Sequence, residues 1–179
     1  PHPMDHAIVL FGNKMPKIFC RMNAINPAGG DAENFCDVTL YGGLKDPVIQ
    51  VHLNSFLTYP PQDMYTISCE FGGLAGGPGG LRWKYFDPAK APRQKLMQGW
   101  SHERQYCNEK LPWVEETWAP SDDAKANSFQ NLSKSFYDNV YDVLVKGAKR
   151  AIGLDQVRRQ IMAIEICHKQ NPLPKRKTR

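Results

Sequence analysis

The order of strand-like and helix-like patterns along the chain limits the folds open to it. Short runs in which apolar and polar residues alternate follow one another between turn signals, and two amphipathic helical patterns come only after them. The runs that we expect to form strands cover residues 17–26, 35–41, 48–57, 65–71 and 81–86. Since no helix separates these strands, they predict an α+β domain with an open, mostly antiparallel sheet of five or six strands and helices on one face.

Helical patterns stand at both ends of the chain. Residues 4–11 are predicted to form a short apolar helix that ends at Gly12. Two longer amphipathic helices follow the strands. We expect the first to end at Gly147 and Asp155 to cap the second.

The glycine-rich segment 72–80 could be mistaken for a phosphate-binding loop. Dinucleotide binding needs G-x-G-x-x-G between a strand and a helix, because the pyrophosphate sits on the helix N-terminus. Here the segment leads into the strand pattern 81–86. We therefore predict a flexible connection between two strands, and no cofactor bound by this chain.

Charge is concentrated at the C-terminus. The chain of 179 residues has a net charge of +5, to which Lys175, Arg176, Lys177 and Arg179 contribute four. We expect one domain over 1–174 and a basic tail over 175–179, with no nucleic-acid partner, because a near-neutral domain lacks the basic groove that such binding requires. No apolar run reaches the roughly 18–20 residues of a membrane span, so no membrane partner is predicted either.

Five widely spaced cysteines without a C-x-x-C pair argue against a disulfide framework and a zinc ribbon. Reduced thiols in a cytoplasmic protein are expected. His2 and His6 are four residues apart on the predicted first helix, yet Pro3 stands where H-E-x-x-H has its glutamate, so no metal site is predicted.

Several segments together resemble the Gfo/Idh/MocA oxidoreductases. His2, Asp5, Leu10 and Gly12 match that family's H-x-x-D-x-x-x-x-L-x-G segment. The order and spacing of further segments are also similar, namely 15–21, 37–41, 51–55, 136–144 and 155–160. The chain is identified on this basis as resembling the family's second domain, the one that lines the substrate pocket.

The resemblance implies an NAD(P)-dependent oxidoreductase acting on a sugar, polyol or related hydroxyl compound. It implies that NAD or NADP is bound by a Rossmann domain preceding this chain, which we expect to be a fragment that is inactive alone. His2 matches the family's catalytic histidine, which takes part in proton transfer to the substrate hydroxyl, and Asp5 of the same motif is a second candidate catalytic residue. The family often dimerises through the open sheet face.

The segment 81–87 offers a candidate substrate contact. In an extended chain Leu81, Trp83, Tyr85 and Asp87 share one face. Trp83 and Tyr85 could stack on and hydrogen-bond a sugar. The alternative is a sheet face buried under the helices.

Two other functions stay open. The chain could be a stand-alone, non-catalytic binding or dimerisation module, or part of a redox-assisted glycosidase of the same family. In each case a homo-oligomer through the sheet face is expected, for which the strands offer large apolar residues: Phe35, Val51, Leu53, Phe56 and Ile67.

Overall fold

The protein is described by a computed structural model over residues 1–24, 33–55, 59, 61–93, 99, 102 and 110–172. The chain forms two compact units, one made of Pro1–Tyr59 with Asp138–Arg179 and the other of Pro60–Tyr137. The predicted basic tail, Phe56 and Cys107 lie outside the described residues.

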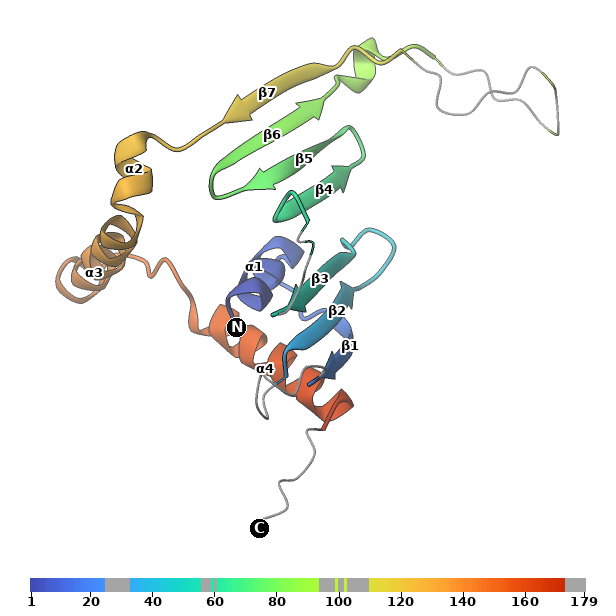
Figure 1. Cartoon of the computed structure of the whole chain (residues 1–179). Coiled ribbons are helices and arrows are strands. Elements are labelled where there is room, and N and C mark those ends of the chain that lie inside the picture. The colour runs from blue at the N-terminus through green and yellow to red at the C-terminus, as the bar shows by residue number, and fades with distance from the viewer. Residues whose placement is uncertain are drawn as a thin grey trace. The chain divides into compact units, whose positions relative to one another are not determined.

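The first unit contains a three-stranded antiparallel sheet, sheet A (Figure 1). Its strands are β1 (Lys17–Asn23), β2 (Phe35–Tyr41) and β3 (Ile49–Asn54), in that spatial order. Cys20 is paired with Val38, and Val38 with Val51. Because directly opposed residues point to the same side, these three side chains share one face of the sheet.

Helices α1 (His2–Phe11) and α4 (Leu154–Gln170) form the core of this unit together with that face. Ile8 and Ala163 are fully buried there beside Val38 and Leu40. The predicted end of the first helix is confirmed, since Gly12 follows α1 with a φ of 98°, a conformation that suits glycine.

The start of α4 differs from the prediction. The residue that caps the helix is Gly153, and Asp155 lies inside the first turn. The carboxylate of Asp155 still favours the helix, because it stands near the positive end of the helix dipole.

The C-terminal end of α4 closes the free edge of β1. The Gln170 side chain accepts from the Cys20 amide at 2.7 Å and donates to the Ile18 carbonyl at 2.8 Å. The Asn171 side chain accepts from the Met22 amide at 3.0 Å and donates to the Cys20 carbonyl at 2.9 Å. Two carboxamides thus take the hydrogen-bonding places that a neighbouring strand would fill.

The second unit contains a four-stranded antiparallel sheet, sheet B. Its strands are β4 (Tyr65–Cys69), β5 (Gly72–Gly77), β6 (Gly80–Tyr85) and β7 (Val114–Trp118), in that spatial order.

The strand register gives sheet B two unlike faces. The aromatic face carries Tyr65, Ile67, Cys69, Leu74, Leu81, Trp83, Tyr85, Val114 and Trp118, with Glu116 among them. The polar face carries Thr66, Ser68, Gly73, Ala75, Arg82, Lys84, Glu115 and Thr117. A sheet with such an alternation presents its polar face to water.

Three further helices are described. A 3-10 turn, η2, covers Pro88–Lys90, and the short helix α2 covers Asp122–Ala126. Helix α3 (Ser128–Lys146) ends at Gly147, as predicted, where φ is 65°. Among the described helices, none is long and apolar enough to cross a membrane.

The α+β class with open antiparallel sheets is confirmed, but the described part of the chain forms seven strands in two sheets. Strand β7 is the sixth strand that the sequence left open. The seventh is the inner strand β5, which Gly72–Gly77 form in the glycine-rich segment, where the prediction of a flexible connection is wrong. A Cβ at Gly72 would collide with the Lys84 carbonyl, and one at Gly73 would lie 2.8 Å from the Ile67 carbonyl. Glycine serves here for the close approach of neighbouring backbones.

Candidate functional site

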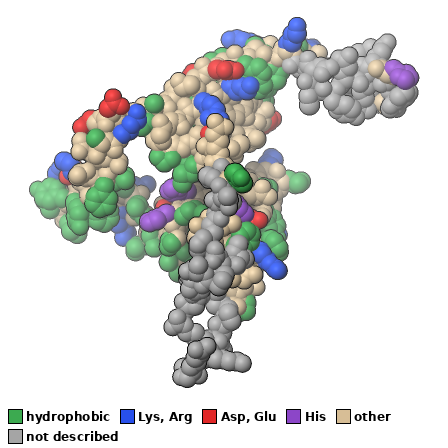
Figure 2. Space-filling view, in the orientation of Figure 1, with side chains coloured by type: hydrophobic (Ala, Val, Ile, Leu, Met, Phe, Trp, Pro, Cys, Tyr) green, Lys and Arg blue, Asp and Glu red, His purple; other side chains and the backbone are tan. Residues whose placement is uncertain are grey.

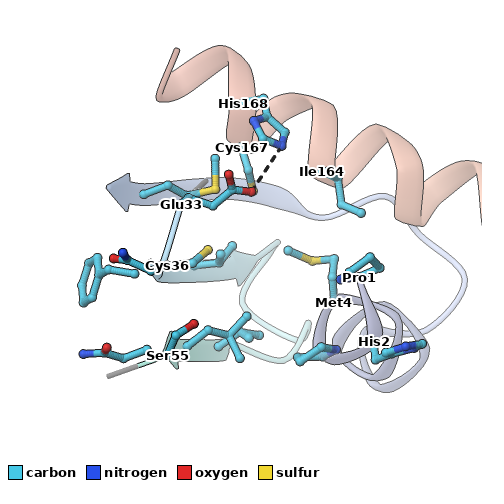
Figure 3. A pocket seen from close by; sticks show the side chains of 17 residues that line it. Pro1, His2, Met4, Glu33, Cys36, Ser55, Ile164, Cys167 and His168 are labelled. Carbon is cyan, nitrogen blue, oxygen red and sulfur yellow. Dashed lines mark ion pairs between the residues drawn. The ribbon is translucent and has the colours of Figure 1, made fainter. Parts of the chain in front are cut away.

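A cavity of about 580 Å³ lies in the first unit, between α1, α4 and the covered face of sheet A (Figure 3). Its inner wall is apolar and includes Met22, Val38 and Val51. Its polar side chains include His2, Glu33 and His168, and the wall also includes Asn34, Asn54 and Ser55. An apolar pocket with a few polar groups is the usual form of a small-molecule site.

The candidate catalytic residue His2 belongs to this cavity. It is the first residue of α1, where Pro1 precedes it and Pro3 fixes the backbone of the first turn. Its side chain is exposed, so the imidazole can exchange protons with solvent or with a bound ligand. The two ring nitrogens of an imidazole can donate and accept a proton, which suits general acid–base catalysis.

Asp5, the other candidate from the same motif, is placed differently. It lies one turn further along α1, is not among the residues that line the cavity, and accepts a hydrogen bond from Gln156 Nε2 of α4 at 3.4 Å. In this arrangement Asp5 connects two helices.

The side chains of Glu33 and His168 lie close together at the cavity, where they form an ion pair when the imidazole is protonated. His168 Nε2 lies 3.8 Å from Glu33 Oε1, and the two side chains are 42% and 32% exposed (Figure 3). They are 135 positions apart in the sequence, so no local pattern could have predicted the pair. The arrangement places a carboxylate and an imidazole together beside an apolar wall.

The cavity also has two cysteines in its wall, Cys36 and Cys167, next to the buried Cys20. Burial is the main cause that raises the pKa of each of these three thiols, and the neighbouring Cys167 raises the pKa of Cys20 further. A thiol with a raised pKa is a poor nucleophile. The described cysteines are free, so no disulfide joins them.

The candidate substrate contacts Trp83 and Tyr85 belong to the second unit. Both lie on the aromatic face, as the alternation predicts. The Tyr85 hydroxyl donates to Glu116 Oε1 at 3.2 Å, and this bond to a carboxylate raises the pKa of Tyr85. Glu116 is a functional candidate that the sequence did not single out, because the pairing of β6 with β7 is needed to find it.

Asp87 does not share that face, which corrects the prediction. Strand β6 ends at Tyr85, and the Asp87 carboxylate accepts from the Ala89 amide at 2.9 Å as the cap of η2. Pro88 at the first position of the turn favours this ending over a longer strand.

The apolar residues expected to form one interface are also divided by the structure. Val51 and Leu53 lie on the covered face of sheet A, whereas Phe35 lies on the opposite face against the His52 ring. Ile67 lies on the aromatic face of sheet B. The period of two along each strand, combined with the register, sets this division.

Comparison with known proteins extends the description. No protein-family model matches the chain, and no curated protein matches it. Among solved structures, an oxidoreductase from Bacillus cereus is similar with a TM-score of 0.63 and 18% identity, over 97% of this chain and 48% of that one.

Two further structures are similar. Proteins from Bacteroides fragilis NCTC 9343 and Klebsiella pneumoniae, each named a "putative oxidoreductase", have TM-scores of 0.59 and 0.57 at 15% and 11% identity. The likeness covers 94% of this chain in both cases, and 48% and 45% of the other chains. This chain shares the fold of these proteins and spans about half of their length.

Proposed function

We propose that the chain is the substrate-binding and dimerisation domain of a Gfo/Idh/MocA-type oxidoreductase acting on a sugar, polyol or related hydroxyl compound. The observation that carries the proposal is the fold shared over 94–97% of this chain with about half of three chains named as oxidoreductases. The half of those chains that is not covered leaves room for a cofactor-binding domain. The His2 motif supports the same family.

NAD or NADP enters this proposal only as a group held by another part of a longer protein. The glycine-rich segment of this chain runs from β5 through a turn into β6, so it has no helix N-terminus to hold a pyrophosphate. The residues described here therefore do not fit a dinucleotide. Titration of this chain with NADH should give no saturable change in fluorescence.

Within the proposal, the contributions of this chain are binding and proton transfer. The cavity wall excludes water from an apolar part of the substrate. His2 holds or accepts the proton of a substrate hydroxyl, while the buried thiols take no part. A cytoplasmic location is part of the proposal, and the widely spaced cysteines without a disulfide pattern in the sequence support it.

The test uses the full-length protein encoded by the gene. The sequence upstream of Pro1 is read first, and the protein is assayed with NAD⁺ and NADP⁺ against a panel of sugars and polyols by absorbance of the reduced cofactor. With an accepted substrate, His2→Asn should lower kcat by about 10²–10⁴-fold. His6→Asn, one turn further along α1 and exposed, is the matched control.

The outcomes separate the candidate functions. An upstream dinucleotide-binding segment together with His2-dependent turnover supports the proposal. Cofactor-dependent cleavage of a glycoside would instead favour a redox-assisted glycosidase. A stop codon or an unrelated domain upstream would defeat the oxidoreductase and leave a non-catalytic module.

A further inference from the structure

A second hollow of the molecule lies on the polar face of sheet B. A groove of about 610 Å³ is lined by residues from all four strands and by Trp113, which immediately precedes β7. Ile67, Leu74, Trp83 and Glu116 also belong to the lining, although the register assigns their side chains to the aromatic face. Most of the lining strand residues belong to the polar face, so we assign the groove to that face.

The small residues of β5 make the groove deep. Gly73 and Ala75 are the residues of β5 on the polar face, and they form the floor. Thr66 of β4 stands on one side, opposite Ala75. Arg82 and Lys84 of β6 stand on the other side, opposite Ala75 and Gly73. A bulky residue at either floor position would fill the hollow.

The charges around the groove are paired. Arg82 donates through both terminal nitrogens to the Asp63 carboxylate, at 2.9 and 2.6 Å. Lys84 Nζ lies 4.0 Å from Glu115 Oε1. Figure 2 shows acidic and basic side chains next to one another over sheet B. Paired charges leave little net field to attract an ionic ligand, yet they present donors and acceptors to hydroxyl groups.

An aromatic ring stands at the end of the groove. The ring centroids of Trp113 and Phe86 are 5.2 Å apart in an edge-to-face arrangement. Phe86 packs in the same way on Phe71, with 5.8 Å between the ring centroids. These contacts fix the orientation of the indole, which is 41% exposed. Lys84 Nζ lies 5.1 Å from the ring centre and adds a donor above it.

We propose that this groove binds a neutral, polyhydroxylated ligand of saccharide type. The apolar face of a pyranose ring suits the fixed Trp113 indole, and its hydroxyl groups suit Thr66, Thr117, Glu115 and Lys84. The site goes beyond the proposed oxidoreductase function, because neither His2 nor a cofactor takes part in it. Its ring-stacking residue is Trp113, not Trp83 or Tyr85 of the aromatic face.

The test observes the tryptophans of the intact chain directly. The chain has four tryptophans, so 5-fluorotryptophan labelling gives a small set of ¹⁹F resonances that single Trp→Phe variants assign. Maltotriose and cellotriose are titrated into the millimolar range. We expect the Trp113 resonance to shift in a saturable way with at least one of them, while the Trp118 resonance on the opposite face stays in place.

Variants then separate binding from folding. Trp113→Ala should reduce the saturation-transfer NMR signal of the bound sugar at least fivefold, whereas Trp118→Ala, which removes a similarly exposed indole (48%), should leave it unchanged. Circular dichroism reports whether each variant folds. If Trp113→Ala does not fold, Ala75→Leu, which fills the floor, should remove the signal instead.

Three results would overturn the inference. The first is the absence of a Trp113 shift with both sugars, and the second is a shift confined to Trp118. The third is a shift with inorganic phosphate alone, which would mean an anion site. Each result is independent of whether the full-length protein oxidises a substrate, so failure here is distinguishable from failure of the oxidoreductase proposal.

Discussion

At the scale of single residues, burial determines how reactive each cysteine thiol is. Cys20 and Cys167 are 4% and 3% exposed, and their raised pKa values keep the thiols neutral near pH 7. Cys69 is exposed on β4. Cys20 and Cys167 therefore fill space in the core of the first unit, whereas Cys69 presents an exposed thiol in the second unit.

This difference predicts a pattern of thiol reactivity. In a Cys107→Ser and Ile67→Lys background, in which the aromatic face of sheet B should stay unpaired, Ellman's reagent should label Cys69 of the folded chain rapidly, whereas Cys20 and Cys167 should react only after denaturant is added, because a buried neutral thiol is a poor nucleophile. Peptide mass spectrometry identifies the labelled residues. Rapid labelling of Cys20 without denaturant would contradict the burial described here.

Single residues also differ in how well the sequence alone indicates their partners. The alternation along the strand correctly predicts that Trp83 and Tyr85 share a face. The Glu33–His168 pair depends on a contact between the start of β2 and the last turns of α4, which no local pattern contains. Whether His2 is catalytic stays a prediction.

At the scale of elements, the side-chain carboxamides of Gln170 and Asn171 join the end of helix α4 to strand β1. Because an outer strand leaves unpaired backbone groups, natural sheets protect such edges. Here Gln170 and Asn171 satisfy the outward groups of Ile18, Cys20 and Met22. The end of α4 is thereby fixed to the sheet by polar contacts as well as by the core.

Replacing one of these amides should destabilise the first unit. Asn171→Ala leaves the Met22 amide and the Cys20 carbonyl without their partner, so the free energy of unfolding should fall by about 1–3 kcal/mol. Urea denaturation followed by circular dichroism measures the change. Lys169→Ala, an exposed neighbour in the same turn, is the control and should change stability by less than about 0.5 kcal/mol.

The glycines of the β5–β6 hairpin are predicted to be unequal. Gly76 has a φ of 139°, and a Cβ there would collide with the Gly80 carbonyl, whereas a Cβ at Gly79 would meet nothing within 4 Å. Gly76→Ala should therefore destabilise the chain by about 1–3 kcal/mol. Gly79→Ala should be nearly neutral. Equal urea midpoints for the two variants would contradict the register of this hairpin.

Elements with a clear period were the ones that the sequence predicted well. The alternation in residues 35–41 matches β2 at both ends, and the glycines after α1 and α3 mark where these helices stop. Strand β5 has almost no side chains, so hydrophobic alternation cannot reveal it. Its existence depends on the backbones of β4 and β6 on either side.

At the scale of the whole molecule, the two units differ in the number of hydrophobic side chains that they bury. The buried hydrophobic side chains of the described residues all lie in the first unit, on α1, α4, β1 and β2. Sheet B instead carries a continuous row of large apolar side chains on one face, of which Trp118 is 48% and Tyr85 is 43% exposed. Such a face is typical of a protein–protein interface.

We predict that the aromatic face of sheet B pairs with the same face of a second copy. Sedimentation equilibrium at micromolar concentration should show a species of twice the 20.3 kDa chain mass, since two-fold pairing through one patch is the commonest solution. Ile67→Lys places a charge on that face and should dissociate the pair. Thr66→Lys, its neighbour on the polar face, should not, and a single 20.3 kDa species at all concentrations would contradict the prediction.

The carboxamides on β1 also limit how sheet A can be extended. An incoming strand finds the outward backbone groups of Ile18, Cys20 and Met22 already hydrogen-bonded, so it cannot be added at the β1 edge. A fibre that grows by strand addition needs both edges of every sheet open. In sheet A the β1 edge is blocked, so this sheet cannot be the repeating unit of such a fibre.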